Sequence, residues 1–141
     1  ELGSRPVDQV IAALVKWTRA LNPADPNYEH HRLEALWMHQ VMNVANELLL
    51  NDILASKEPR ARAAAVRVHC YWRDRVNQPL ATLAKLVKDP HPRVRLEAVR
   101  SLSFFNTSKA AEIALESVEL PQDQYLKYTL DETMRTLDRF K

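Results

Sequence analysis

The side chains that could bind a metal ion or act as a nucleophile are five histidines and one cysteine. His30 and His31 are adjacent, so they point about 100° apart on a helix, and His39 follows eight residues after His31. No two histidines have the spacing of four that places both imidazoles on one helix face, and Cys70 has no second cysteine as a fellow ligand. We therefore expect this chain to bind no metal ion.

His69 and Cys70 lie in an apolar pattern. His69 takes a position that Val41, Leu102 and Met134 hold in similar stretches, so we expect a partly buried imidazole satisfied by a hydrogen bond or by water. Cys70 could form a reactive thiolate beside nearby arginines, but an inert buried thiol fits an apolar helix better. Paired catalytic carboxylates, a nucleophile elbow and a phosphate loop do not stand out, so we expect no enzymatic activity.

Basic residues are concentrated in the middle of the chain. Residues 57–100 carry 11 basic and 4 acidic side chains, whereas residues 1–56 carry 4 and 7, and residues 101–141 carry 5 and 7. The formal net charge of +2 therefore conceals a strongly basic central segment. Such a segment can attract a phosphate, a nucleic acid or an acidic protein surface.

Four arginines of this central segment form a candidate interaction surface. Arg60 and Arg67 are seven residues apart, as are Arg93 and Arg100, so each pair shares one face of a helix. The second pair lies one repeat of the sequence pattern after the first. Because acidic residues lie among them, a solvated or ion-paired face is the main interpretation, with a protein partner or nucleic acid as the alternatives.

Composition indicates that helices carry these residues. The chain of 141 residues is long enough for one domain, and it contains one glycine, at position 3, and eight prolines. Strand-rich folds and phosphate loops need glycine where φ is positive, so its scarcity argues against both. No apolar run approaches the roughly 18 residues of a membrane span, and we expect no membrane contact by this segment. The predicted fold class is all-α.

One apolar helix stripe recurs along the chain. Val94, Ala98, Leu102 and Phe105 have the spacing i, i+4, i+8 and i+11, which places them on one helix face. The other three copies contain Leu33, Trp37, Val41 and Val44, then Ala65, His69 and Trp72, then Leu126, Leu130, Met134 and Leu137. The four copies recur with a period of roughly 30 residues, which predicts a short α-solenoid of stacked helical hairpins.

We expect about eight helices, which form three hairpins with one flanking helix at each end. Trp17, Trp37 and Trp72 are expected to fill the contacts between repeats, and an exposed aromatic platform is the alternative. Residues 1–5 are expected to be a cloning remnant or disordered, and residues 6–141 to be a single domain excised from a larger protein. The expected helices cover residues 6–21, 28–43, 46–54, 59–75, 78–88, 91–105, 108–118 and 122–139.

The pattern Asp-x-x-Pro-x-Val-Arg-x-x-Ala-x-x-x-Leu, which begins at Asp89, resembles a HEAT repeat. The resemblance implies a ladder in which the aspartate of one repeat pairs with the arginine of its neighbour. The matching residues are Asp89, Arg95 and, in the preceding copy, Arg62. Ser56 stands where that preceding copy should have its aspartate, so the expected ladder is incomplete.

Four longer strings, at residues 28–40, 62–76, 89–105 and 128–134, are similar to the HEAT segment of large bacterial membrane-bound-dehydrogenase-like, haem-binding proteins. The resemblance implies a periplasmic or extracytoplasmic location. It also implies a parent with a sugar-dehydrogenase-like propeller and a c-type cytochrome. The haem motif of that family, Cys-x-x-Cys-His, is missing, so we expect no haem and no other cofactor here.

These observations predict a non-catalytic scaffold or protein-interaction module within a larger extracytoplasmic redox protein. Its expected partners are neighbouring domains of the parent chain or another protein. The alternative is binding of nucleic acid or another anionic ligand by the central arginine-rich helices.

Overall fold

The computed structural model describes residues 5–119 and 124–138, and within these ranges it contains helices and no strand. This confirms the all-α class and the solenoid architecture expected from the repeated stripe. The helices are α1 (Arg5–Arg19), α2 (Tyr28–Val41), α3 (Glu47–Leu54), α4 (Pro59–Tyr71), α5 (Pro79–Leu86), α6 (Pro92–Leu102), α7 (Ser108–Leu115), the short 3-10 helix η1 (Glu116–Glu119) and α8 (Gln124–Leu137).

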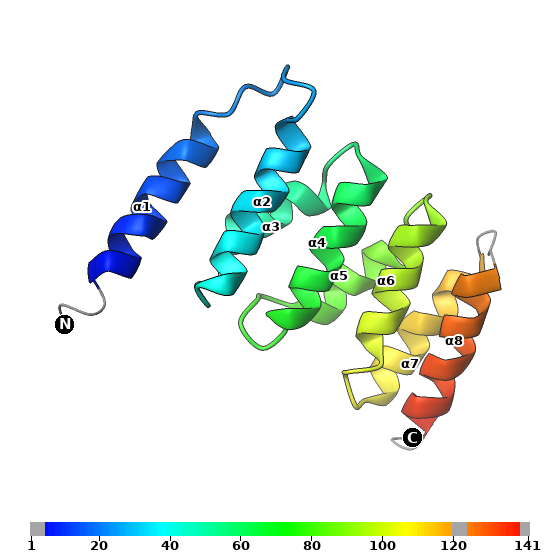
Figure 1. Ribbon diagram of the computed structural model, residues 1–141. Helices are drawn as coiled ribbons and strands as arrows, with labels where there is room; N and C mark the ends of the chain where they lie inside the picture. Colours follow the sequence, from blue (N-terminus) through cyan, green and yellow to red (C-terminus); the bar gives the residue numbers. More distant parts are fainter. Residues whose placement is uncertain (1–4, 120–123, 139–141) are drawn as a thin grey trace.

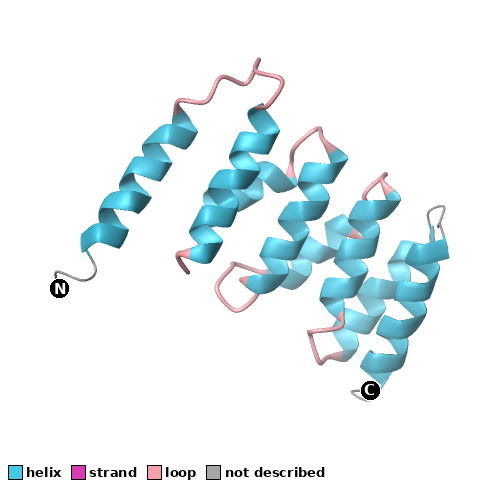
Figure 2. Ribbon diagram, in the orientation of Figure 1, coloured by secondary structure: helices cyan, strands magenta, loops and turns pink. Residues whose placement is uncertain are grey.

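The helices form two layers (Figure 1). Helices α2, α4, α6 and α8 lie side by side in the front layer, α3, α5 and α7 lie behind them, and α1 lies at the N-terminal end. The hairpins α2–α3, α4–α5 and α6–α7 are joined by short turns at the edges of the layers (Figure 2). We call the contact between two neighbouring helices of the front layer a seam.

Proline and capping residues set where the helices begin. Pro59, Pro79 and Pro92 are the first residues of α4, α5 and α6, where a missing backbone N–H removes no helical hydrogen bond. The Asn46 side chain accepts a hydrogen bond of 3.0 Å from a backbone N–H in the first turn of α3. Thr107 caps α7 in the same way, at 3.2 Å.

Three helices end three or four residues earlier than the sequence pattern predicts. Helix α4 ends at Tyr71 instead of near residue 75, α6 ends at Leu102 instead of near 105, and α7 ends at Leu115 before η1. Tight turns with backbone bonds between residues three apart follow, such as the bond of 3.0 Å from Phe105 to Leu102. Phe105 still packs against the core, so the apolar pattern continues past the end of the helix.

Two groups of buried side chains form the core. One extends from α4 to α8 and contains Val94, Ala98 and Leu102, which the predicted stripe of α6 placed there. The other joins α2, α3 and α4 around Leu50 and Trp72, both with 0% exposed surface. Helix α4 contributes to both groups and therefore connects the two halves of the array.

The predicted stripe on α2 is wrong at Trp37 and Val41. Leu33 is buried, but Trp37 is 41% exposed and Val41 is 82% exposed. The buried face of α2 contains Leu36 instead, and the stripe is therefore rotated on this helix. The predicted stripe through Trp37 and the buried stripe through Leu36 both start at Leu33. Apolar spacing alone therefore does not distinguish them. Trp17 on α1 is also 45% exposed, so of the three tryptophans only Trp72 is buried in a seam.

Candidate interaction surface on α4 and α6

A ladder of arginine contacts joins α4 to the turn before α6. Arg62 donates two hydrogen bonds to the Asp89 carboxylate, from Nε to Oδ2 at 2.8 Å and from Nη2 to Oδ1 at 2.9 Å. It donates a third, of 2.9 Å, to the backbone carbonyl of Ser56. Arg95, with 1% exposed surface, donates a bond of 2.6 Å to the carbonyl of Asp89. These largely buried, charge-assisted bonds fix the relative position of the two helices.

Ser56 keeps the turn geometry of Asp89 but supplies no carboxylate. Its Oγ accepts a hydrogen bond of 3.0 Å from the backbone N–H of Glu58. In the same way, Asp89 Oδ1 accepts one of 2.9 Å from the backbone N–H of His91. In the α2/α4 seam, Ser56 lines a hollow of about 540 Å³. Glu29 and Arg32 line the same hollow and pair with each other at 2.7 Å.

The four arginines of the candidate surface lie around one buried carboxylate. Arg67 on α4 and Arg100 on α6 approach Glu97, at 2.8 Å and 4.0 Å respectively. The Glu97 side chain is 3% exposed, whereas those of Arg67 and Arg100 are 65% and 55% exposed. The hydrogen bond with Glu97 and its negative charge raise the pKa of Arg67. Arg67 is thus held by a hydrogen bond of 2.9 Å to Glu97, Arg100 lies at the outer limit of an ion pair with it, and both arginine side chains are more than half exposed.

Arg60 and Arg93 lie beside this pair, around a hollow of about 450 Å³ between α4 and α6. Within the described ranges, neither arginine forms an ion pair. The small side chains of Ala63 and Ala64, with Arg67 and Glu97, complete the lining. We call this hollow the α4–α6 groove.

An exposed aromatic row continues the surface beyond the arginines. Tyr71, at the end of α4, is 58% exposed, and Phe104, just after α6, is 53% exposed. The Arg73 guanidinium lies 5.0 Å from the centre of the Phe104 ring, in cation–π geometry. The sequence pattern did not predict this row because both residues fall outside the core stripe. They occupy equivalent positions in consecutive repeats, and that equivalence is the signal that could have found them.

Two histidines are buried within the helical array. His39 and His69 are each 1% exposed, and burial lowers the pKa of both. His39 Nε2 lies 3.3 Å from the side-chain nitrogen of Asn46. No described protein atom forms a hydrogen bond with either ring nitrogen of His69, and the negative charge of Glu47 partly offsets the lowering of its pKa. The expectation that His69 is only partly buried is wrong, because the imidazole is fully enclosed.

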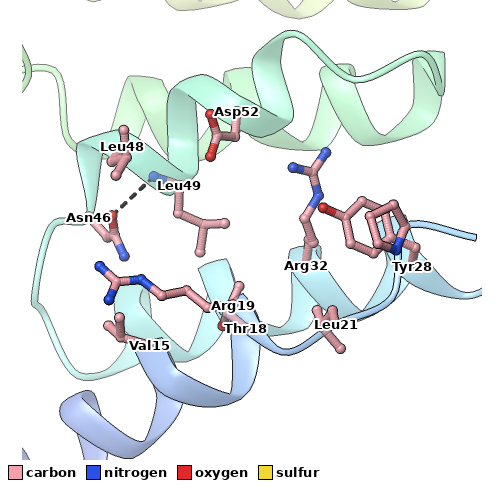
Figure 3. Close-up of a pocket in the computed structure, with 11 residues that line it drawn as sticks. Val15, Thr18, Arg19, Leu21, Tyr28, Arg32, Asn46, Leu48, Leu49 and Asp52 are labelled. Atoms are coloured by element: carbon pink, nitrogen blue, oxygen red, sulfur yellow. Dashed lines mark hydrogen bonds between the residues drawn. The ribbon is translucent and has the colours of Figure 1, made fainter. Parts of the chain in front are cut away.

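A third hollow, of about 540 Å³, lies between α1, α2 and α3 (Figure 3). Arg19, Arg32, Tyr28 and Asp52 line it together with apolar side chains. Arg32 is already paired with Glu29 and lies 4.7 Å from the centre of the Tyr28 ring. The described residues contain no group of three side chains arranged to hold a metal ion. None of the described helices is long and apolar enough to cross a membrane.

Stacked helical hairpins with arginine–aspartate contacts between repeats define an α-solenoid. The model of the HEAT repeats family matches residues 46–135, and the chain belongs to this family. The resemblance of the Asp89 pattern to a HEAT repeat is thereby confirmed. No curated protein and no solved structure matched the chain.

Proposed function

We propose that this chain is a non-catalytic scaffold that holds a protein partner, or neighbouring domains of its parent chain, in fixed geometry. HEAT repeats are non-enzymatic helical repeats that generally mediate protein–protein interactions. One observation carries the proposal. Helices α4 and α6 are fixed by the Arg62–Asp89 pair, while their outer faces present arginine and aromatic side chains that the core does not use. A rigid support with unused binding groups is what a docking module needs.

The proposed setting is a large extracytoplasmic redox protein in which residues 6–141 form one helical domain. Its support is the similarity of four sequence strings to the helical segment of dehydrogenase-like, haem-binding proteins. In that setting the array separates and orients domains that carry the redox chemistry. The arrangement needs no cofactor in the array itself.

Site-specific photo-cross-linking in the full-length natural protein tests the scaffold role. A photo-reactive amino acid replaces Tyr71 or Phe104 on the outer face of the front layer. The same replacement at Leu48 on α3 and Leu115 on α7 samples the back layer, because both side chains are also exposed. We expect cross-links to one identified polypeptide or neighbouring domain. Absence of a polypeptide cross-link from all four positions contradicts the proposal.

Nucleic-acid binding by the same arginines is the second candidate, favoured by the exposed guanidinium groups of Arg67 and Arg100. Filter binding of DNA at low and high salt tests it. Several phosphate contacts would give an affinity that falls steeply as salt rises. The carboxylate of Glu97, which lies between these arginines, argues against a phosphate track here.

A further inference from the structure

We propose that the α4–α6 groove binds an acidic peptide segment that also carries apolar side chains. The acidic part lies against Arg60 and Arg93, and the apolar part covers Tyr71 and Phe104. This inference rests on the proposed scaffold function, to which it adds one surface and one class of partner.

Charge complementarity identifies the acidic part of the segment. Three guanidinium groups, of Arg60, Arg67 and Arg93, line the groove, and among the described residues Glu97 is the only carboxylate that lines it. Its oxygens already face Arg67 and Arg100, so Arg60 and Arg93 have no carboxylate of this chain as a partner within the described residues. A guanidinium group binds carboxylates in a bidentate manner, which suits aspartate and glutamate side chains of a partner.

The aromatic row identifies the apolar part and sets a length. Arg60 and Tyr71 lie about three helical turns apart on α4, and Arg93 and Phe104 have the same separation along α6 and its last turn. At 1.5 Å per helical residue, each pair spans about 17 Å. About five extended residues, or three helical turns, cover that distance. The groove and the aromatic pair beyond it therefore fit one short segment with its charges at one end and its apolar side chains at the other.

The neighbouring helices favour a protein segment over a nucleic acid. The outer face of α2 carries Glu34, Trp37 and Val41, and on α8 the exposed Arg135 is already paired with Glu132 at 2.8 Å. The basic band thus stops after two helices, whereas an extended phosphate backbone gains affinity from each additional cation it contacts. Exposed aliphatic and aromatic side chains beside the band suit the apolar residues of a peptide.

Selection from a phage-displayed library of random twelve-residue peptides tests the proposal directly on the folded chain. We expect the selected peptides to be rich in aspartate and glutamate in one half and in leucine, phenylalanine or tryptophan in the other. Arg60→Glu/Arg93→Glu should weaken their binding about tenfold or more, since this variant leaves both ion pairs of Glu97 intact. Tyr71→Ser should weaken it less, and circular dichroism checks that each variant is folded.

The matched control is Lys85→Glu/Lys109→Glu, which makes the same change of charge on α5 and α7 in the back layer. It should leave peptide binding unchanged. Peptides without acidic residues, or peptides that bind Arg60→Glu/Arg93→Glu as tightly as the unmodified chain, overturn the inference. So does salt-steep DNA binding that this variant abolishes.

The two proposals fail in different ways. Cross-links to an identified protein from Leu48 and Leu115, with none from Tyr71 or Phe104, would keep the scaffold role and reject the α4–α6 groove. Loss of polypeptide cross-links from all four positions would reject the scaffold role itself.

Discussion

The α4/α6 seam and the α2/α4 seam use equivalent repeat positions, but different interactions hold them together. In the α4/α6 seam the Asp89 carboxylate accepts two hydrogen bonds from Arg62, and Glu97 pairs with Arg67. At the position equivalent to Asp89, the α2/α4 seam has Ser56 and a hollow. At this repeat position the α4/α6 seam therefore has an ion pair that joins neighbouring repeats, whereas the α2/α4 seam has a hollow in which Arg32 pairs with Glu29 of the same helix.

Other contacts hold the α2/α4 seam. Its core is built around Leu50 and Trp72, and hydrogen bonds also connect the residues that follow α4 to α3 and to the turn before it. The Arg75 side chain donates to the carbonyl of Asn43 at 3.1 Å, and Glu47 accepts a bond of 2.9 Å from the backbone N–H of Asn77. We infer that apolar burial carries more of the stability of this seam, whereas the α4/α6 seam combines apolar burial with ion pairs.

The largest expected effect is on the apolar core of the α2/α4 seam. Trp72→Ala should lower the free energy of unfolding by about 3–5 kcal/mol, because it leaves a large cavity where the side chain has no exposed surface. Trp37→Ala, on the outer face of the same seam, should cost less than about 1 kcal/mol. Urea denaturation measures both values. Equal losses would show that Trp72 does not dominate this core.

The second-largest effect is expected at Asp89, and it should exceed the effect at Ser56, which is the equivalent turn residue of the other seam. Asp89→Ala should cost about 3 kcal/mol, because it leaves the largely buried Arg62 guanidinium without its carboxylate. Ser56→Ala removes one hydrogen bond and should cost about 1 kcal/mol. If urea denaturation gives similar values for the two variants, the ion pair contributes nothing beyond the turn.

The regular part of the fold could be predicted from the sequence because its repeats share one pattern. Val94, Ala98 and Leu102 are buried as their spacing requires, and Pro59 and Pro92 begin their helices. The order of the hairpins follows from the same period. These features depend on local spacing, which a single sequence contains.

Other features depend on how neighbouring helices pack, and the sequence did not reveal them. Helix α2 carries two apolar stripes, and only packing against α3 and α4 selects the one with Leu36 over the one with Trp37. The arginines could be placed on shared helix faces by counting. Counting could not show that Glu97 is buried between two of these arginines, with Tyr71 and Phe104 nearby. This arrangement depends on the relative position of α4 and α6.

A smaller effect is expected from overfilling the α4/α6 seam. Ala98 has no exposed surface, so Ala98→Leu should force neighbouring side chains apart and cost roughly 1–3 kcal/mol. Ala64→Leu makes the same change on the half-buried lining of the groove and should stay within about 0.5 kcal/mol. Thermal unfolding followed by circular dichroism compares them. An unchanged melting temperature for Ala98→Leu would mean that the seam has spare volume.

The smallest expected effect is a pH dependence that arises from buried His39 and His69. Burial lowers the pKa of both imidazoles below the ordinary value of about 6.5 that they regain in the unfolded chain. The unfolded state therefore binds more protons, and stability rises with pH across this window. The stability contributed by the neutral imidazoles should be fully present above about pH 7. It should decline as the pH falls through about 6.5, before most carboxylates begin to titrate.

Hydrogen exchange should show α2 and α4 losing protection before α6 does. A double variant, His39→Gln/His69→Gln, cannot charge at these positions and should lose most of this slope. An equal slope in the variant would show that groups other than His39 and His69 cause the pH dependence. The expected early loss of protection in α2 and α4 would then have no basis.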